Sequence, residues 1–194
     1  MEPKKEDRRV RLTKLAICES LVELMQTYPI SKISVKMLCE AADINRSTFY
    51  AHYKDQYALL HAVQQGVIED VKRQVFSTQF FDASEGAQQV LEHLFAYGKE
   101  NAALIRVLLN ENGDASFHSE LMELAQEKIM AEMQVGGPPP AYVTQYLKHF
   151  ILGGMLSIMR YWLDGNCAQP PEVVAALMIQ LVVNGTNGMR AAQC

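Results

Sequence analysis

Apolar residues recur along most of this chain at the three- and four-residue spacing that is typical of helices. In no segment do apolar and polar residues alternate as they would in a half-buried strand. The pattern therefore predicts an all-α protein of about nine helices. The first helix is expected over residues 7–28 and ends before Pro29, which cannot continue the hydrogen-bond ladder. Its apolar stripe contains Leu12, Leu15, Ala16, Leu21, Val22, Leu24 and Met25.

Capping and turn residues divide the rest of the chain. Ser34 can cap a short helix over 35–42, and residues 43–45 then form a tight turn. A third short helix is expected over 46–53. The remaining helices are predicted at 56–80, 83–99, 101–111, 114–133, 141–164 and 171–189.

Glycine and proline mark the turn between the last two predicted helices. Gly165 is suited to a left-handed cap, and Pro170 and Pro171 can start the final helix, where a missing N–H does no harm.

We expect two domains, the first over residues 1–55 and the second over residues 56–194.

Composition excludes several classes of protein. The 194 residues are 49% hydrophobic and 21% charged, which is ordinary for a globular protein. The most apolar segment, 142–163, contains Lys148, His149 and Arg160, so no membrane span is expected. Acids and bases mix in the first 12 residues without an apolar run, so no secretory signal is expected either.

The four cysteines, Cys18, Cys39, Cys167 and Cys194, show neither a disulfide framework nor the spacing of a metal site. We therefore expect no metal and a cytoplasmic location. Charge is distributed unevenly, because residues 1–75 hold 12 lysines and arginines against 10 acids, whereas 76–194 hold 6 against 12. A basic N-terminal region on an acidic protein is consistent with contact to a polyanion.

The segment 33–60 carries the most functional information. It reads as two short helices that are joined by a three-residue turn and anchored by Phe49 and Tyr53. The third helix would then present a polar face that suits insertion into the major groove of DNA. This face contains Arg46, Ser47, Thr48, Tyr50 and His52. The same segment could instead be a structural corner, with His52 only a solvated surface residue.

Residues 41–55, AADINRSTFYAHYKD, followed by Leu59 and Leu60, resemble the recognition element of TetR/AcrR-type transcription regulators. The resemblance extends over residues 10–60, and 161–165 with the following Pro-Pro-Glu resembles the end of a frequent C-terminal subtype. It implies an N-terminal three-helix helix-turn-helix domain. A long helix would join this domain to a C-terminal helical domain for ligand binding and dimerisation.

The resemblance also implies a role for individual residues. Arg46, Thr48 and His52 occupy positions that reach base edges, and Tyr50 matches an aromatic residue that reaches a phosphate and nearby bases. Ser34 and Lys54 are expected to approach phosphates. Further phosphate contacts could come from Arg8, Arg9 and Arg11. Two positions depart from the family pattern, because Asp43 replaces a turn glycine and Gln56 stands where a second lysine is common.

The helices expected at 141–164 and 171–189 are rich in apolar and small residues, which suits a four-helix interface between two subunits. The candidate interface residues are Ile151, Met155, Ile158, Val174, Leu177, Met178 and Leu181. The alternative is that both helices bury these side chains within one subunit.

Residues 76–135 would form the body in which family members often enclose a small ligand. Candidate pocket residues, including some from later helices, are His93, Phe95, Tyr97, Arg106, His118, Met122, Met130, Tyr146 and Trp162. Each of these could equally be an ordinary core residue.

The sequence therefore predicts a repressor that binds a palindromic operator as a homodimer. A small apolar or aromatic effector would release it from the DNA. The alternative is a co-regulator or protein-interaction module that keeps the fold without reading DNA. We expect that the protein is not an enzyme and needs no cofactor, because the sequence contains no phosphate-binding glycine loop, nucleophile elbow or metalloprotease motif.

Overall fold

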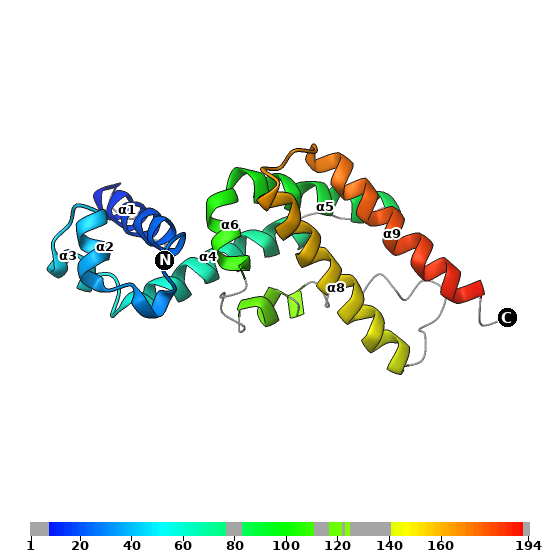
Figure 1. Ribbon diagram of the computed structural model, residues 1–194, viewed down its shortest axis with the longest axis horizontal. Helices are drawn as coiled ribbons and strands as arrows, with labels where there is room; N and C mark the ends of the chain where they lie inside the picture. The colour runs from blue at the N-terminus through cyan, green and yellow to red at the C-terminus, as the bar shows by residue number, and fades with distance from the viewer. Residues whose placement is uncertain (1–7, 77–82, 111–116, 122, 125–140, 192–194) are drawn as a thin grey trace, which may run out of the picture. The chain divides into compact units, whose positions relative to one another are not determined.

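The computed structural model describes residues 8–76, 83–110, 117–121, 123–124 and 141–191 (Figure 1). The regular structure of these residues is helical and includes no strand, which confirms the predicted all-α class. The chain divides into two units, Met1–Val67 and Ile68–Cys194. This division falls within the long helix α4, Gln56–Phe76, whereas the sequence analysis placed the functional boundary at the start of that helix.

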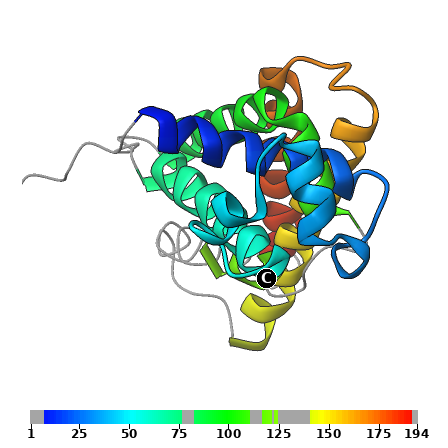
Figure 2. The same ribbon diagram turned by 90° about the vertical axis from the view of Figure 1, so that its left-hand side faces the viewer.

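Unit 1 contains three helices, a 3-10 turn and the first part of α4. The elements before α4 are α1 (Arg8–Met25), η1 (Ile30–Lys32), α2 (Val35–Ala41) and α3 (Arg46–Tyr50). Helix α2 packs against both α1 and α3 (Figures 1 and 2). The core of the unit includes Ile17, Leu21, Ile33, Leu38, Cys39, Phe49, Leu59, Leu60 and Val67.

The buried face of α1 differs in part from the predicted stripe. Ile17, Ser20 and Leu21 are buried. The Ser20 hydroxyl donates a hydrogen bond of 2.8 Å to the Ala16 carbonyl of the same helix. Leu12 and Leu15, which were expected to face inward, are exposed. The prediction was wrong for these two because the first turns of α1 carry apolar side chains on more than one face.

Two helices, α1 and α3, end three residues earlier than predicted. Helix α1 stops at Met25, and the Tyr28 N–H bonds to the Leu24 carbonyl in a closing turn, because a residue before proline avoids helical geometry. Helix α3 stops at Tyr50 rather than at residue 53. There the N–H groups of His52 and Tyr53 both bond to the Phe49 carbonyl.

Unit 2 contains the end of α4 and the remaining helices. These are α5 (Ala83–Glu100), α6 (Ala102–Leu109), α8 (Ala141–Asp164) and α9 (Pro171–Ala191). Residues 117–121 and 123–124 are also helical, and the rest of the helix predicted over 114–133 lies outside the described residues. Helix α5 packs along α9 and also contacts α6 and α8, while α6 packs against α8 (Figure 1).

Two contacts between α5 and α8 show how closely these helices approach. The rings of Phe95 and Trp162 meet edge to face with centroids 5.1 Å apart. Near them, a Cβ atom added at Gly98 would lie 3.0 Å from the sulfur of Met159. The absence of a side chain at Gly98 therefore lets Met159 pack directly on the α5 backbone.

The turn between α8 and α9 corrects one prediction. The left-handed residues are Asn166 (φ 54°) and Cys167 (φ 53°), not Gly165. Gly165 still makes a helical hydrogen bond to the Tyr161 carbonyl, so the chain reverses one residue later than expected. Asparagine adopts the left-handed region more readily than most residues. Pro171 is the first residue of α9, as predicted.

None of the helices in the described ranges is long and apolar enough to cross a membrane. Within the same ranges, no group of three or more His, Cys, Asp or Glu side chains could hold a metal ion.

Candidate functional site

The turn between α2 and α3 determines how α3 is presented. The Ile44 N–H bonds to the Cys39 carbonyl at 3.0 Å, and Asp43 has a φ of 51°, in the left-handed region. Aspartate tolerates this region better than most non-glycine residues. Asp43, where the resemblance implies a turn glycine, therefore adopts the left-handed conformation at this turn.

Phe49 anchors α3 to the core of unit 1. Its side chain is 0% exposed, and its ring lies 5.9 Å from that of Tyr53 and 5.8 Å from that of Tyr50. The Tyr53 hydroxyl in turn lies 4.0 Å from the sulfur of Cys18 on α1. Burial raises the pKa of the Cys18 thiol, which the Tyr53 contact partly opposes. Phe49 and Tyr53 therefore hold α3 in place from within.

The outer surface of α3 is polar. Arg46 and Ser47 are exposed, and the Tyr50 ring is 57% exposed although it packs edge-on against buried Phe49. Thr48 and His52 are half-buried, and His52 lies beyond the end of the helix. Three of the five predicted contact residues thus project freely, while two have only part of their surface available.

Helix starts on either side of α3 are capped by side chains. The Ser34 hydroxyl accepts a hydrogen bond of 3.3 Å from the Met37 N–H at the start of α2. The Asp55 carboxylate accepts one of 2.8 Å from the Ala58 N–H at the start of α4. The sequence analysis missed the Asp55 cap, although aspartate directly before a predicted helix is a recognised capping signal.

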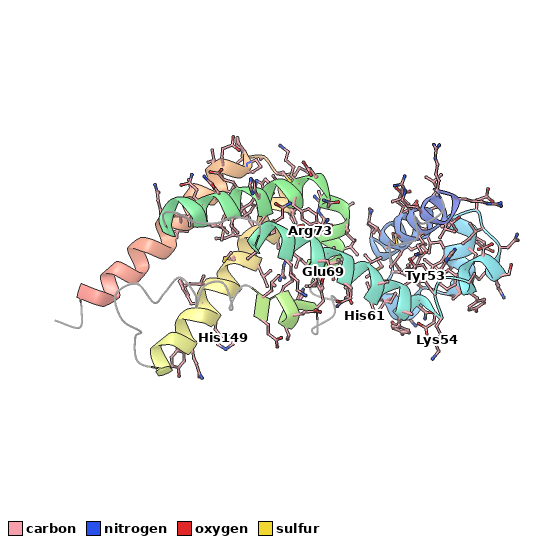
Figure 3. The ribbon with its side chains drawn as sticks, turned by 180° about the vertical axis from the view of Figure 1, so that it is seen from behind. Tyr53, Lys54, His61, Glu69, Arg73 and His149 are labelled. Carbon is pink, nitrogen blue, oxygen red and sulfur yellow. The ribbon has the colours of Figure 1, made fainter. Side chains whose placement is uncertain are left out.

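Cationic side chains lie exposed on the same unit. Lys54 points away from the helices while its neighbour Tyr53 lies among them (Figure 3). Arg8, Arg9 and Arg11 are exposed in the first turn of α1. Gln56, at the position where the family often has lysine, is half-buried. The exposed positive charge of this unit therefore includes Lys54, Arg46 and the arginines of α1.

The predicted pocket residues of unit 2 are in different environments. His93 and Tyr146 are exposed, and His118 is half-buried with its Nε2 atom inaccessible to solvent. Phe95 is buried, and Trp162 is buried and donates to the Gln169 carbonyl at 2.9 Å. Met122 and Met130 lie outside the described residues.

Two other pocket candidates make specific polar contacts between helices. Tyr97 donates a hydrogen bond of 3.0 Å to Asp70 on the part of α4 within unit 2. Asp70 lies in sequence between Glu69 and Arg73, which Figure 3 labels on this helix. Arg106 donates to the Leu163 carbonyl at the end of α8. Their assignment to a ligand pocket remains a prediction.

The predicted dimer residues divide into two groups. Ile151, Val174 and Met178 are buried within the chain itself. Leu177 and Leu181 are exposed, and Met155 and Ile158 are half-buried. The sequence analysis omitted two of the most exposed apolar side chains of these two helices, namely Phe150 and Tyr161.

Comparison with known proteins shows a family match in the C-terminal part of the chain. Residues 85–184, more than half of the 194-residue chain, match a TetR-family model described as a transcriptional regulator C-terminal region. A curated relative, the uncharacterised HTH-type transcriptional regulator YxbF of Bacillus subtilis (strain 168), is 23% identical over 172 residues. These residues are 84% of this chain but 43% of the relative, so the chain spans less than half of that protein's length.

Solved structures show the same fold. A TetR transcriptional regulator from Streptococcus agalactiae 2603V is 22% identical, with a TM-score of 0.66 over 91% of this chain and 97% of that one. The regulator FadR from Bacillus subtilis, solved with stearoyl-CoA, is 14% identical, with a TM-score of 0.69 over 88% and 98%. The chain belongs to the TetR family of transcriptional regulators.

Proposed function

We propose that this chain is a repressor that binds a palindromic operator as a homodimer and leaves it when a small effector binds. The observation that carries the proposal is the exposed polar surface of α3, formed by Arg46, Ser47 and Tyr50, above the fully buried Phe49. A five-residue helix with a polar outer surface adds little to stability, so its exposed side chains are free to recognise a partner.

The side chains of this surface match the chemistry of a DNA groove. The guanidinium of Arg46 can donate two parallel hydrogen bonds to O6 and N7 of guanine, a pairing that reads base identity. Thr48, His52 and Ser47 can reach neighbouring base edges or phosphates. Tyr50 and Lys54, both exposed, suit phosphate oxygens, which position the protein without reading sequence.

Ser34 would contribute through the helix that it caps. Its hydroxyl already accepts from the Met37 N–H, so it can still donate its own proton to a phosphate. The N-terminus of α2 adds a favourable dipole at this position. Arg8, Arg9 and Arg11 would extend the phosphate contacts from the first turn of α1.

A homodimer is supported by exposed apolar side chains on α8. Tyr146, Phe150 and Tyr161 are all largely exposed, the last at 84%. Gly153 and Ser157, which are also exposed, lie between them at spacings of three and four residues. These five positions form one face of the helix, and large aromatic side chains on an exposed face are typical of an interface.

Helix α9 carries a similar exposed row. Val173, Leu177 and Leu181 recur every four residues and are each about half exposed. Two such helices from each subunit would form a four-helix interface, together with half-buried Met155 and Ile158. A two-fold symmetric dimer presents two copies of α3, and this predicts a palindromic operator.

The effector is proposed to be a small apolar or aromatic molecule that binds within unit 2. The FadR structure contains stearoyl-CoA, which shows a ligand in a protein of the same fold. Release of DNA requires that the effector bind the DNA-incompetent conformation more tightly than the DNA-competent one. Such a regulator needs no cofactor and catalyses no reaction, and it would act where the chromosome lies, in the cytoplasm.

The test is selection of bound duplexes from a random DNA pool at a fixed, near-physiological salt concentration. Native protein is compared with a Thr48→Ala, Tyr50→Ala double variant. The matched control is Tyr28→Ala, which removes an exposed tyrosine of the same unit outside α3. We expect the native protein and the control to enrich one palindromic site that the double variant does not enrich.

The other results are equally informative. If all three folded proteins enrich the same site, α3 is not the reading element. If none enriches any site, the co-regulator or protein-interaction alternative takes first place. Equal enrichment of non-palindromic half-sites would contradict the symmetric dimer.

A further inference from the structure

Arg106 of α6 reaches the end of α8, and Arg160 of α8 lies one turn before that end. Arg106 of α6 donates to the Leu163 carbonyl, and its Nε lies 3.5 Å from an oxygen of Asp164. Arg160 precedes Leu163 and Asp164 by three and four residues on α8, so all three lie on neighbouring positions of one helix face. The two guanidinium groups are therefore carried to the same end of α8.

Polar atoms around this contact lack hydrogen bonds. The Nε atoms of both Arg106 and Arg160 are inaccessible to solvent and have no hydrogen-bond partner among the described residues. The same holds for the amide oxygen of Asn110, the residue that directly follows α6. In folded proteins most buried polar groups are hydrogen-bonded, so three buried polar atoms without a hydrogen bond call for an explanation, although the Arg106 Nε also has its ion pair with Asp164.

The charges at this contact do not balance. A guanidinium remains protonated throughout the accessible pH range, so both arginines are positive. Asp164 is more than half exposed and is the acid that pairs with Arg106, so among the described residues one positive charge is in excess. Rotation of the Asn110 amide would exchange its oxygen for its NH2 group, which would then be a third donor group beside the two guanidinium groups.

We propose that Arg106, Arg160 and Asn110 bind an oxyanion, a carboxylate or a phosphate group, beside the last turn of α8. An oxyanion accepts from both guanidinium groups at once, and such charge-assisted bonds are about twice as strong as neutral ones. The negative end of the α8 dipole opposes an anion here, but Arg106 already satisfies the Leu163 carbonyl. The proposal deepens the effector part of the proposed function and rests on it only for the link to DNA release.

The experiment measures binding of three probes to the full chain at constant ionic strength by isothermal titration. The probes are sodium phosphate, sodium acetate and sodium octanoate. The main variant is Arg160→Gln, because Arg106 also satisfies the end of α8, and Arg160→Lys is the conservative variant. The control is Arg73→Gln, which removes an exposed arginine that pairs with Asp70 elsewhere in unit 2.

We expect saturable binding of at least one probe, weakened by roughly tenfold or more in Arg160→Gln, which corresponds to about 1.4 kcal/mol. Arg160→Lys keeps the charge without the planar fork and should weaken binding less. Arg73→Gln should leave it unchanged. Circular dichroism of each variant shows whether its helices are intact, so a loss of binding can be distinguished from a loss of structure.

The probes distinguish the source of the oxyanion. Binding of phosphate alone indicates a phosphate group, and equal binding of acetate and octanoate indicates a bare carboxylate. Tighter binding of octanoate indicates the acid group of an effector with an apolar chain. The proposal is overturned if no probe saturates, or if native protein and both Arg160 variants bind alike. Failure of operator binding would leave these results unaffected.

Discussion

The hydroxyl of Tyr97 on α5 donates a hydrogen bond of 3.0 Å to the Asp70 carboxylate on α4. Arg73, one turn further along α4, pairs with the other oxygen of the same carboxylate. Burial, the hydrogen bond to Asp70 and its negative charge together raise the pKa of Tyr97. This contact ties the second half of the long α4 helix to the body of unit 2.

We expect Tyr97→Phe to lower the free energy of unfolding by about 1 kcal/mol, because one partly buried hydrogen bond is lost while the ring remains. Asp70 keeps its ion pair with Arg73 in this variant, so the free energy of unfolding should fall by no more than this amount. Urea denaturation at neutral pH measures it. An unchanged midpoint would show that the Tyr97 hydroxyl contributes nothing to stability.

The same contact predicts a pH dependence. Because folding raises the tyrosine pKa above its usual 10.0, the folded state holds the phenolic proton at a pH where the unfolded state has lost it. The stabilisation is therefore complete below pH 10 and declines as pH rises through the raised pKa. We expect native protein to lose stability above pH 10 more steeply than Tyr97→Phe does. Parallel curves would contradict this assignment.

Secondary structure could be predicted largely from local signals. Pro29, Asn45 and Pro171 stand at or beside helix starts or breaks, and the periodic apolar residues between them determined element type. The prediction errors occurred at the ends of α1 and α3, where the last backbone hydrogen bonds form turns that the apolar periodicity does not reveal. A proline or glycine in the sequence shows where a helix cannot continue, but it does not show how the last turn of that helix closes.

The faces of α8 and α9 could not be predicted in the same way. Phe150 is exposed and Ile151 is buried, and likewise Val173 is exposed and Val174 is buried. When adjacent residues are both apolar, periodicity cannot tell which one faces the core. The partners of Tyr97 and Arg106 were also beyond prediction, because each lies on another helix far away in the sequence.

The cap at the start of α4 gives a third prediction. Asp55→Ala removes the acceptor for the Ala58 N–H and should destabilise unit 1 by about 1 kcal/mol. Asp55→Asn keeps a capping oxygen and should cost only a fraction of that. Thermal unfolding compares the three proteins. Equal losses in both variants would mean that the charge of Asp55, not its cap, stabilises the helix.

Phe49 and Tyr50 are neighbours that should respond to substitution in opposite ways. Phe49→Ala empties a fully buried site and should cost about 3–5 kcal/mol of stability. Tyr50→Ala removes an exposed ring and should change stability by less than about 0.5 kcal/mol while weakening DNA binding. Urea unfolding and DNA titration of both variants test the contrast. It fails if Tyr50→Ala unfolds the protein or binds DNA normally.

The proposed dimer interface can be tested by charge. Tyr161→Glu together with Leu177→Glu places carboxylates on the exposed rows of α8 and α9 and should yield folded monomers. Gln89→Glu, at an exposed position of α5, is the control and should remain dimeric. Light scattering after size-exclusion chromatography gives the mass. A dimer that survives the double substitution would place the interface elsewhere.

The most direct test of DNA reading by α3 is equilibrium binding to the selected palindrome and to a scrambled duplex, followed by fluorescence anisotropy at physiological salt. We expect native protein to prefer the palindrome by a factor of about 10³ or more. Arg46→Ala should lose about 1–3 kcal/mol on the palindrome and relax its preference at one base pair in each half-site. Equal affinity of native protein for both duplexes, or an Arg46→Ala variant with unchanged preference, would contradict the proposal that α3 reads an operator.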